Sequence, residues 1–382
     1  MDNSDSKSSA TKKRDVAKMT SEDRRNFMKF VGAAAIASSA AGCATFPRAS
    51  DSFDEIPRLK LTNLPTACNK LENVTKLVGG PDLYIKRDDV MELAHGGNKT
   101  RKLEYGLAEA LNNDAKAVVT QGGLQSNHVR QTCSGAAKVG LECHVILSNP
   151  VPEMEEELKG SGNYLMDQLM GAHIYLAEDG RGPVVEDVLS DLTAAGKNPY
   201  NIPAGASNGI GSLGYVNAAR ELITQWDEMG ISPSHVFTAT GSCGTQAGLL
   251  MGLRYFGNTT TQVVGISVSA PSARLEDRTR EVLTMISEVA AIPREVVPDG
   301  DVYVNDEYIG AGYGRPTDAG IAAMRTLAEN EGIILDPIYT GKCMSGMLNM
   351  LRKRALDNAR DVVFIHTGGA PAIHPYAEFL RA

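Results

Sequence analysis

The chain has 382 residues, of which 42% are hydrophobic and 22% charged, an ordinary composition for a globular protein long enough for two packed lobes. Its formal net charge of -8 argues against nucleic acid as the main partner, because that role needs a basic surface. The six cysteines form no Cys-x-x-Cys pair, which argues against a zinc knuckle or a thioredoxin-like motif. We expect most of them to be small apolar core residues.

Residues 1–43 are typical of an export signal. The adjacent Arg24 and Arg25 precede an apolar run at residues 30–41, an arrangement that resembles a twin-arginine signal. The run is too short to span a bilayer, which needs about 20 residues; the alternative is a basic patch followed by a buried helix. The small residues before Cys43 resemble a lipoprotein processing site. The sequence departs from that pattern at Ala40, where such sites usually carry leucine. We expect twin-arginine export to the periplasm, followed either by lipidation of Cys43 and membrane anchoring or by simple cleavage.

After a linker at residues 44–58, short apolar strands alternate with amphipathic helices. The predicted strands are 83–86, 117–120, 143–147, 173–176, 235–239, 263–268 and 362–366, and the predicted helices include 98–111, 129–139, 164–170 and 248–255. Such alternation favours an α/β fold with parallel sheets covered by helices.

The first segment that indicates chemistry is Gly96-Gly97-Asn98-Lys99. The two glycines free the backbone, and Lys99 then falls at the start of a predicted helix. A lysine that forms a Schiff base must be held by a rigid element and be deprotonated, and burial and the positive end of a helix both lower a lysine pKa. Most lysines at helix starts are solvated surface charges, so the pattern alone leaves both interpretations open.

Two further loops join a strand to a helix and are suited to anions. In residues 121–131, Ser126 and Asn127 stand at N-cap positions, where they either only cap the helix or also help its free N–H groups to bind a carboxylate. In residues 238–245, glycines and hydroxyl residues form an anion nest. It matches neither a Walker A loop nor the dinucleotide fingerprint, so a single phosphate fits it better than a nucleotide.

These segments, together with Asp336-Pro337-Ile338-Tyr339-Thr340, strongly resemble the 1-aminocyclopropane-1-carboxylate deaminase/D-cysteine desulfhydrase family, over nearly everything from Pro57 to Phe379. The resemblance implies pyridoxal 5'-phosphate (PLP) as cofactor. It also implies PLP fold type II, the fold of the tryptophan synthase β-subunit, with the cofactor between two parallel-sheet α/β domains. The large domain would comprise residues 59–100 and 212–382, and the small domain residues 101–211. Relatives are commonly dimers, so we expect a homodimer.

The resemblance also implies roles for individual residues. Lys99 would hold the cofactor as a Schiff base, Tyr339 would transfer a proton at the substrate, and Tyr313 would be a second active-site tyrosine. The implied catalytic residues are Lys99, Tyr339, Tyr313 and Ser126; the cofactor-binding residues are Lys99, Asn127, Gly241, Ser242, Cys243, Gly244, Thr245 and Thr340; and the substrate-binding residues are Ser126, Asn127 and His128. No metal ligand is implied.

Thr340 is the position that favours one reaction over another. Ring-opening deaminases carry glutamate there, as a partner of the pyridine nitrogen, and D-cysteine desulfhydrases carry threonine. A hydroxyl leaves the ring a weaker electron sink, which suffices when a β-substituent leaves at once. We therefore expect α,β-elimination on a small amino acid, above all D-cysteine, yielding pyruvate, sulfide and ammonia, with Lys99 or Tyr339 removing the α-proton.

Three alternatives stay open. The first is an L-cysteate sulfo-lyase, which would need an additional cation near the β-position of the substrate. The second is an aminocyclopropane carboxylate deaminase, which Thr340 disfavours. The third is a non-catalytic periplasmic binder of PLP or amino acids, which would be expected to have lost Lys99 or Tyr339.

Overall fold

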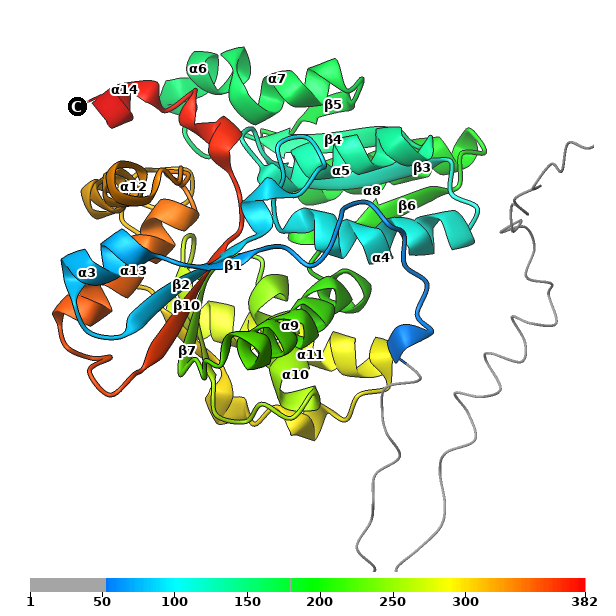
Figure 1. The fold of residues 1–382 in the computed structure, drawn as a ribbon. Helices are drawn as coiled ribbons and strands as arrows, with labels where there is room; N and C mark the ends of the chain where they lie inside the picture. The colour runs from blue at the N-terminus through cyan, green and yellow to red at the C-terminus, as the bar shows by residue number, and fades with distance from the viewer. Residues whose placement is uncertain (1–52, 179, 382) are drawn as a thin grey trace, which may run out of the picture. The chain divides into compact units, whose positions relative to one another are not determined.

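The computed structural model of the chain describes residues 53–178 and 180–381, drawn in colour in Figure 1. The predictions of an export signal, of Cys43 lipidation and of most of the linker lie outside these residues. Within the described ranges, no helix is long and apolar enough to cross a membrane.

Two sheets organise the described part of the chain. The larger has six strands in the order β1 (Cys68–Lys70), β2 (Asp82–Arg87), β10 (Asp361–His366), β7 (His235–Thr240), β8 (Gln262–Ser267) and β9 (Tyr303–Asn305). The smaller has four strands in the order β5 (His173–Leu176), β4 (Glu142–Ser148), β3 (Ala117–Gly123) and β6 (Pro199–Ile202). All neighbouring pairs are parallel except β1 with β2, which confirms the predicted parallel sheets.

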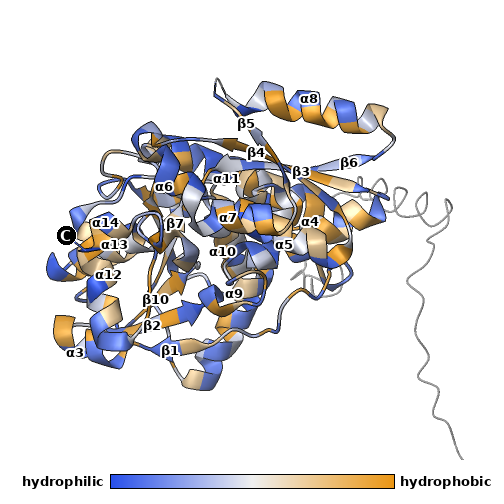
Figure 2. Ribbon diagram, turned by 90° about the horizontal axis from the view of Figure 1, so that it is seen from above, coloured by the Kyte–Doolittle hydropathy of each residue, from blue (hydrophilic) through white to orange (hydrophobic). Residues whose placement is uncertain are grey.

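Helices cover both faces of both sheets (Figure 1). The helices are α3 (Glu72–Val78), α4 (Lys99–Asn112), α5 (Asn127–Val139), α6 (Glu155–Gly160), α7 (Gly162–Leu169), α8 (Arg181–Ala194), α9 (Gly209–Met229), α10 (Gly244–Tyr255), α11 (Ser272–Ala290), α12 (Asp318–Glu331), α13 (Thr340–Arg352) and α14 (Ala377–Arg381). On one face of the large sheet the core is built with α9, α10 and α11, and on the other with α3, α12 and α13. Figure 2 shows α8 on one side of the small sheet and α4 and α5 on the other.

Burial on both faces explains why the central strands are continuous apolar runs. All six residues of β10 are buried, since β2 and β7 flank it and helices cover both of its faces. The small sheet lies between a core cluster built with α4 and α5 and a second cluster built with α8. Its strands fall within residues 101–211, and the strands of the large sheet fall outside that range. The domain limits themselves stay a prediction.

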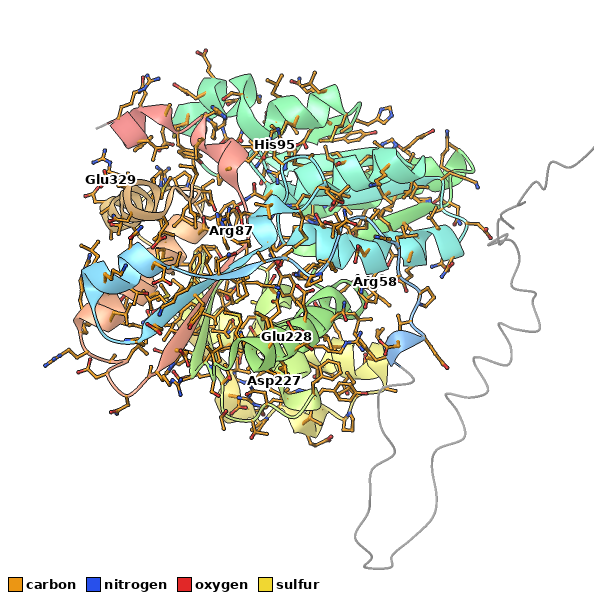
Figure 3. The ribbon with its side chains drawn as sticks, in the orientation of Figure 1. Arg58, Arg87, His95, Asp227, Glu228 and Glu329 are labelled. Atoms are coloured by element: carbon orange, nitrogen blue, oxygen red, sulfur yellow. The ribbon has the colours of Figure 1, made fainter. Side chains whose placement is uncertain are left out.

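Buried ion pairs fix the start of α4, the helix that carries Lys99. The guanidinium of Arg101 donates to the Asp88 carboxylate at 2.9 Å and to the Glu221 carboxylate at 2.9 Å, and Arg101 and Asp88 are both fully buried. Further along α4, Glu104 accepts a 2.7 Å bond from Arg58, labelled in Figure 3. Removing one partner of such a buried pair typically costs about 3–5 kcal/mol, so α4 is held firmly against α9 and the preceding chain.

Candidate active site

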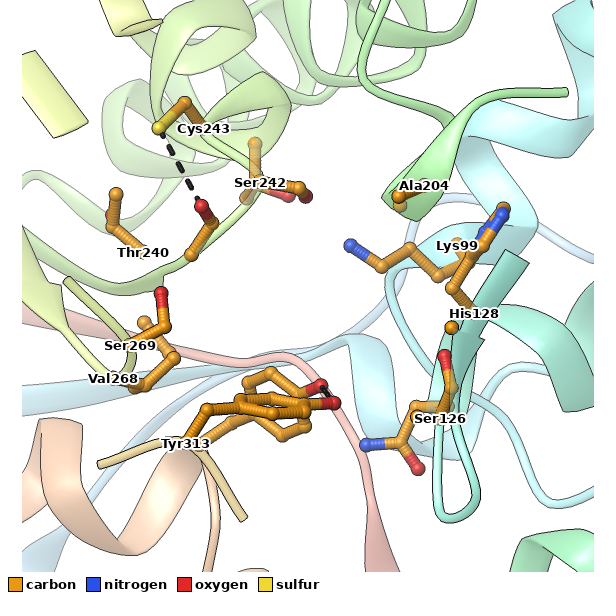
Figure 4. A pocket seen from close by; sticks show the side chains of 18 of the residues that line it. Lys99, Ser126, His128, Ala204, Thr240, Ser242, Cys243, Val268, Ser269 and Tyr313 are labelled. Carbon is orange, nitrogen blue, oxygen red and sulfur yellow. Dashed lines mark hydrogen bonds between the residues drawn. The ribbon is translucent and has the colours of Figure 1, made fainter. Parts of the chain in front are cut away.

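A cavity of about 450 Å³ lies where the carboxyl ends of strands from both sheets meet (Figure 4). Residues at or just after the ends of β3, β4, β7, β8 and β10 line it, which is where open parallel sheets bind ligands. The predicted site residues among its lining are Lys99, Ser126, Asn127, His128, Gly241, Ser242, Cys243, Thr245, Tyr313 and Tyr339. The structure thus brings together residues from segments that lie far apart in the chain.

Lys99 begins α4 and extends its amine into this cavity (Figure 4). The turn before it needs glycine, because Gly96 has a φ of 70° and a Cβ there would lie 1.9 Å from the Asp89 carbonyl oxygen. Burial lowers the pKa of Lys99 to about 8. Among the described residues, none accepts a hydrogen bond from its Nζ. An appreciable share of the amine is therefore unprotonated near neutral pH, as a nucleophile towards an aldehyde must be.

The loop between β7 and α10 forms a compact anion cradle. Cys243 adopts a left-handed conformation with a φ of 69°, and α10 then begins at Gly244, whose N–H donates to Ser207 Oγ at 3.2 Å. The next N–H groups lack intrahelical partners, as in the first turn of any α-helix. A Cβ on Gly244 would lie 2.6 Å from Ser207 Oγ and 2.7 Å from Lys102 Nζ, so this position has no room for a side chain. Gly244 does not itself line the cavity. Its neighbours Ser242, Cys243 and Thr245 do.

Lys102 is a residue of this cradle that the sequence analysis missed. It is fully buried, and its ammonium group donates to the Gly205 carbonyl oxygen and to Ser207 Oγ, both at 3.1 Å. Burial, and after it the charge of Lys99, hold the pKa of Lys102 well below its usual range. A dianionic phosphate at the start of α10 would favour the charged form of this amine. The one feature of the sequence that could have pointed to Lys102 as a phosphate partner is its position one turn after Lys99 on α4.

Tyr313 and Tyr339 form a hydrogen-bonded pair at the cavity wall. Their hydroxyl oxygens are 2.5 Å apart and their ring centroids 5.8 Å apart, in an edge-on arrangement. Burial raises the pKa of both phenols, and that of Tyr339 lies well above its ordinary value. Both hydroxyls therefore stay protonated near neutral pH, so this pair is suited to donating a proton rather than removing one.

The loop between β3 and α5 places polar groups at the start of α5. Ser126 caps the helix by accepting a 3.3 Å bond from the Val129 N–H. His128 lies against Thr120 at 2.7 Å, and burial holds the pKa of its imidazole well below the usual range, so the ring is neutral. The cap uses the Val129 N–H, so the N–H groups of Asn127 and His128 are the ones that remain for a carboxylate.

Arg130, which is fully buried, connects this loop to the turn that precedes Lys99. Its guanidinium donates to Asn127 Oδ1 at 3.1 Å, to Asn163 Oδ1 at 2.6 Å and to the Gly96 carbonyl oxygen at 2.6 Å. Because these hydrogen bonds involve a charged donor, they are stronger than neutral ones. Arg130 therefore fixes the position of Asn127 relative to the segment that leads to Lys99.

Thr340 does not line the cavity, and its role beside the cofactor stays a prediction. Its hydroxyl donates to Asp336 Oδ2 at 2.7 Å and accepts the Asp336 N–H at 2.7 Å. A hydroxyl has one proton, so Thr340 would have to release Asp336 before it could donate to a pyridine ring. Thr367, which follows β10 at the end of a central parallel strand, lines the cavity instead. Its position directly after a central parallel strand could have indicated from the sequence that Thr367 lines a ligand site.

Arg181 is a second cavity residue that the sequence analysis missed. It begins α8 after the loop from β5, and its charge acts on the Tyr313 phenol by lowering that pKa. None of the described carboxylates forms an ion pair with it. The cavity thus contains one guanidinium that is left for an anionic ligand.

A family model described as "Pyridoxal-phosphate dependent enzyme" matches residues 59–368. The chain belongs to this family. Among curated PLP-family relatives, the D-cysteine desulfhydrase of Salmonella typhi is 38% identical over 322 residues, covering 84% of this chain and 96% of the relative. That of Serratia proteamaculans (strain 568) is 39% identical over 324 residues, with the same coverage.

Solved structures confirm the predicted fold class. The crystal structure of an ACC deaminase homologue matches with a TM-score of 0.78 and 34% identity, over 88% of this chain and 99% of that one. A fungal L-serine ammonia-lyase from Rhizomucor miehei matches with a TM-score of 0.59 at 18% identity, over 84% of this chain and 99% of that one, which shows the shared fold alone.

The residues present fit the cofactor of this PLP family. The amine of Lys99 enters the cavity, and Ser242, Cys243 and Thr245 line it at the start of α10. Asn98 Nδ2 donates to Thr245 Oγ1 at 2.9 Å, which joins the lysine segment directly to the cradle. The predictions of the family and of PLP as cofactor are confirmed, whereas the roles of individual site residues stay predictions.

Proposed function

We propose that this PLP enzyme eliminates the β-substituent of a small amino acid, with D-cysteine as substrate and pyruvate, sulfide and ammonia as products. The observation that carries the proposal is the arrangement of an amine and two phenols around one cavity: Lys99 and the Tyr313–Tyr339 pair enter it from different sides (Figure 4). The D-cysteine desulfhydrases of Salmonella typhi and Serratia proteamaculans support the choice of substrate. When bound, the cofactor holds the substrate amine and withdraws electrons from Cα, which makes the α-proton acidic.

The pKa values favour Lys99 as the base and Tyr339 as the acid. The amine of Lys99, with a pKa of about 8, accepts the proton when the Cα–H bond breaks. The electron pair from that bond forms the Cα–Cβ double bond as the Cβ–S bond breaks, and sulfur leaves with the electrons of the Cβ–S bond. Tyr339, whose phenol burial keeps protonated, is placed to supply a proton to the departing sulfide. The released product then hydrolyses to pyruvate and ammonia.

The start of α5 is the proposed binding site of the substrate carboxylate. Ser126 and Asn127 line the cavity at this helix end, where N–H groups point towards an anion. Asn127 is positioned by Arg130, so the loop is ordered before substrate binds. Ordering in advance lowers the free energy lost on binding and keeps the Cα–H bond at a constant angle to the cofactor.

A substrate panel tests the proposal. The holoenzyme is assayed with D- and L-cysteine, L-cysteate, β-chloroalanine, D-serine and 1-aminocyclopropane-1-carboxylate, and pyruvate, sulfide and 2-oxobutyrate are measured. We expect D-cysteine to have the highest kcat/KM and to release sulfide and pyruvate in equal amounts. Turnover of the cyclopropane substrate alone, with 2-oxobutyrate as product, would overturn it.

Arg181 favours a second candidate, the elimination of sulfite from L-cysteate. Among the described residues, no carboxylate pairs with this guanidinium in the cavity, and a β-sulfonate would be a suitable anionic partner. Replacing Arg181 with alanine is expected to lower kcat/KM for cysteate at least tenfold more than for D-cysteine, and lysine should restore part of the difference. Equal losses for the two substrates, or turnover of cysteate too slow to measure in the parent enzyme, would reject this candidate.

We infer from residues 1–43 that the enzyme is exported to the periplasm by the twin-arginine route. Lysine at both Arg24 and Arg25 is expected to retain the enzyme in the cytoplasm, as measured by cell fractionation. Labelling with a radioactive fatty acid, compared between the parent and Cys43→Ala, distinguishes lipidation from simple cleavage. We also propose a homodimer, for which light scattering would give twice the mass of the chain.

A further inference from the structure

Three metal-ligating side chains meet at the amino ends of β4 and β5. His144 on β4 stands directly opposite His173 on β5, and Glu142 lies two residues before His144, on the same face of the sheet. One ligand atom from each of the three lies within 4.8 Å of the other two. The two imidazole rings are stacked, with centroids 4.4 Å apart and planes 12° from parallel.

His144 is the fixed member of this cluster, and one of its nitrogens has no partner. It is only 5% exposed, and its Nδ1 lies 3.0 Å from the Tyr175 hydroxyl, which sets the orientation of the ring. Its Nε2 is buried, and no hydrogen-bond partner for it exists among the described residues, since Glu142 Oε2 lies 3.6 Å away. A buried polar atom without a partner is rare and unfavourable, so a missing ligand is the simplest explanation.

Glu142 supplies the negative charge of this cluster, and Lys197 offsets part of it. Glu142 uses Oε1 for an ion pair with Lys197 at 2.5 Å, and its Oε2 is the oxygen that faces His144. Burial disfavours the charged form of His144, and a neutral imidazole with its Nδ1 proton directed at Tyr175 presents a free lone pair on Nε2. His173 is exposed and its ring is stacked on that of His144, so it would have to turn on its side-chain bonds to direct a nitrogen at the same point.

We propose that Glu142, His144 and His173 form a site for a divalent transition-metal ion of the Zn²⁺ class. Two imidazole nitrogens and one carboxylate oxygen are ligands that Zn²⁺ prefers, whereas Mg²⁺ and Ca²⁺ prefer oxygen ligands alone. Water would complete the tetrahedral shell. The ion would bridge β4 to β5, which is an edge strand paired only with β4 among the described strands.

The proposed metal site is separate from the cavity. β4 runs from Glu142 to Ser148, and Ser148 lines the cavity. Four residues separate His144 from Ser148 and six separate Glu142 from it, so at about 3.3 Å per residue these ligands lie roughly 13–20 Å from the cavity along β4. The ion is therefore expected to stabilise the edge of the small sheet rather than to take part in the elimination.

Metal titration of the PLP-loaded enzyme tests the site. The protein is purified without a polyhistidine tag, treated with a chelator, desalted, and titrated with Zn²⁺ in competition with a chromophoric chelator. Substrate is left out, because cysteine itself binds Zn²⁺. We expect one equivalent bound with a Kd in the micromolar range or below, and a melting temperature that Zn²⁺ raises by several degrees.

Variants at the exposed ligands make the test specific. His173→Ala and Glu142→Gln are expected to weaken Zn²⁺ binding at least tenfold and to abolish the rise in melting temperature. His374→Ala, which removes an exposed histidine outside the cluster, should bind as the parent does. Turnover of D-cysteine should not change in any of the three. Less than half an equivalent bound by the parent, or equal binding by parent and His173→Ala, would overturn the proposal.

Discussion

Asp167 is a buried carboxyl whose ionisation should make the stability of this enzyme depend on pH. It lies on α7, is fully buried, and neither of its oxygens accepts a hydrogen bond from a described residue. Burial raises the pKa of Asp167 to about 8, although the nearby Cys133 thiol and the charge of Arg130 act in the opposite direction. The carboxyl is therefore mostly protonated at neutral pH in the folded protein.

The sign of the effect follows from the two pKa values. In the unfolded chain an aspartate has a pKa of about 3.9, so between about pH 4 and 8 the folded state holds a proton that the unfolded state has released. The free energy of unfolding then falls as pH rises through this window, by at most about 1.4 kcal/mol per pH unit. Over roughly four units the loss is on the order of 5 kcal/mol.

Asp167→Asn removes this titration and keeps the shape of the side chain. Urea unfolding midpoints of the parent and the variant, measured between pH 5 and 9, should diverge as the pH rises. The two proteins are expected to be similar near pH 5, and the variant to be the more stable by several kcal/mol near pH 9. Asp187→Asn, at an exposed position on α8, should follow the parent. A constant difference between the parent and Asp167→Asn at every pH would refute the reasoning.

Three further substitutions test the site itself. Arg130→Met removes the donors that position Asn127 and the Gly96 carbonyl. Steady-state kinetics should show kcat reduced about 100-fold with PLP still bound, and Arg130→Lys should recover part of the loss. A change in kcat below twofold would contradict a positioning role. Gly244→Ala places a Cβ 2.6 Å from Ser207 Oγ and should weaken PLP binding at least tenfold by equilibrium dialysis, whereas Gly106→Ala, with open space around it, should not. Tyr339→Phe should lower the rate of sulfide release about 100-fold without weakening PLP binding, and unchanged release would show that this phenol is not the proton donor.

Much of the fold could be predicted from residue patterns. Buried parallel strands such as β3 and β10 are apolar runs in the chain, and loops such as 238–245 combine glycines with hydroxyl residues after such a run. Helix starts were less certain, because α10 begins at Gly244 and not at residue 248. The glycines at the start of this helix have low helix propensity but are needed where the backbone surrounds an anion.

The residues that the sequence analysis missed depend on contacts between distant segments. Nothing local distinguishes Arg181 from the solvated arginines of other helix starts, and only the packing of the two sheets brings it to the cavity. The same holds for Thr367, which only the packing of the two sheets brings to the cavity. Thr340 donates to Asp336 in the structure, and its role beside the cofactor stays a prediction.

The central claim is that Lys99 holds the cofactor, and its most direct test is the visible absorbance of purified Lys99→Ala after incubation with PLP. The parent and Lys116→Ala, which changes an exposed lysine beyond the end of α4, should both show the band of covalently bound PLP and turn over D-cysteine. Lys99→Ala should show neither the band nor measurable sulfide release while keeping the circular dichroism of the parent. Retention of the band with full turnover in Lys99→Ala would contradict the account.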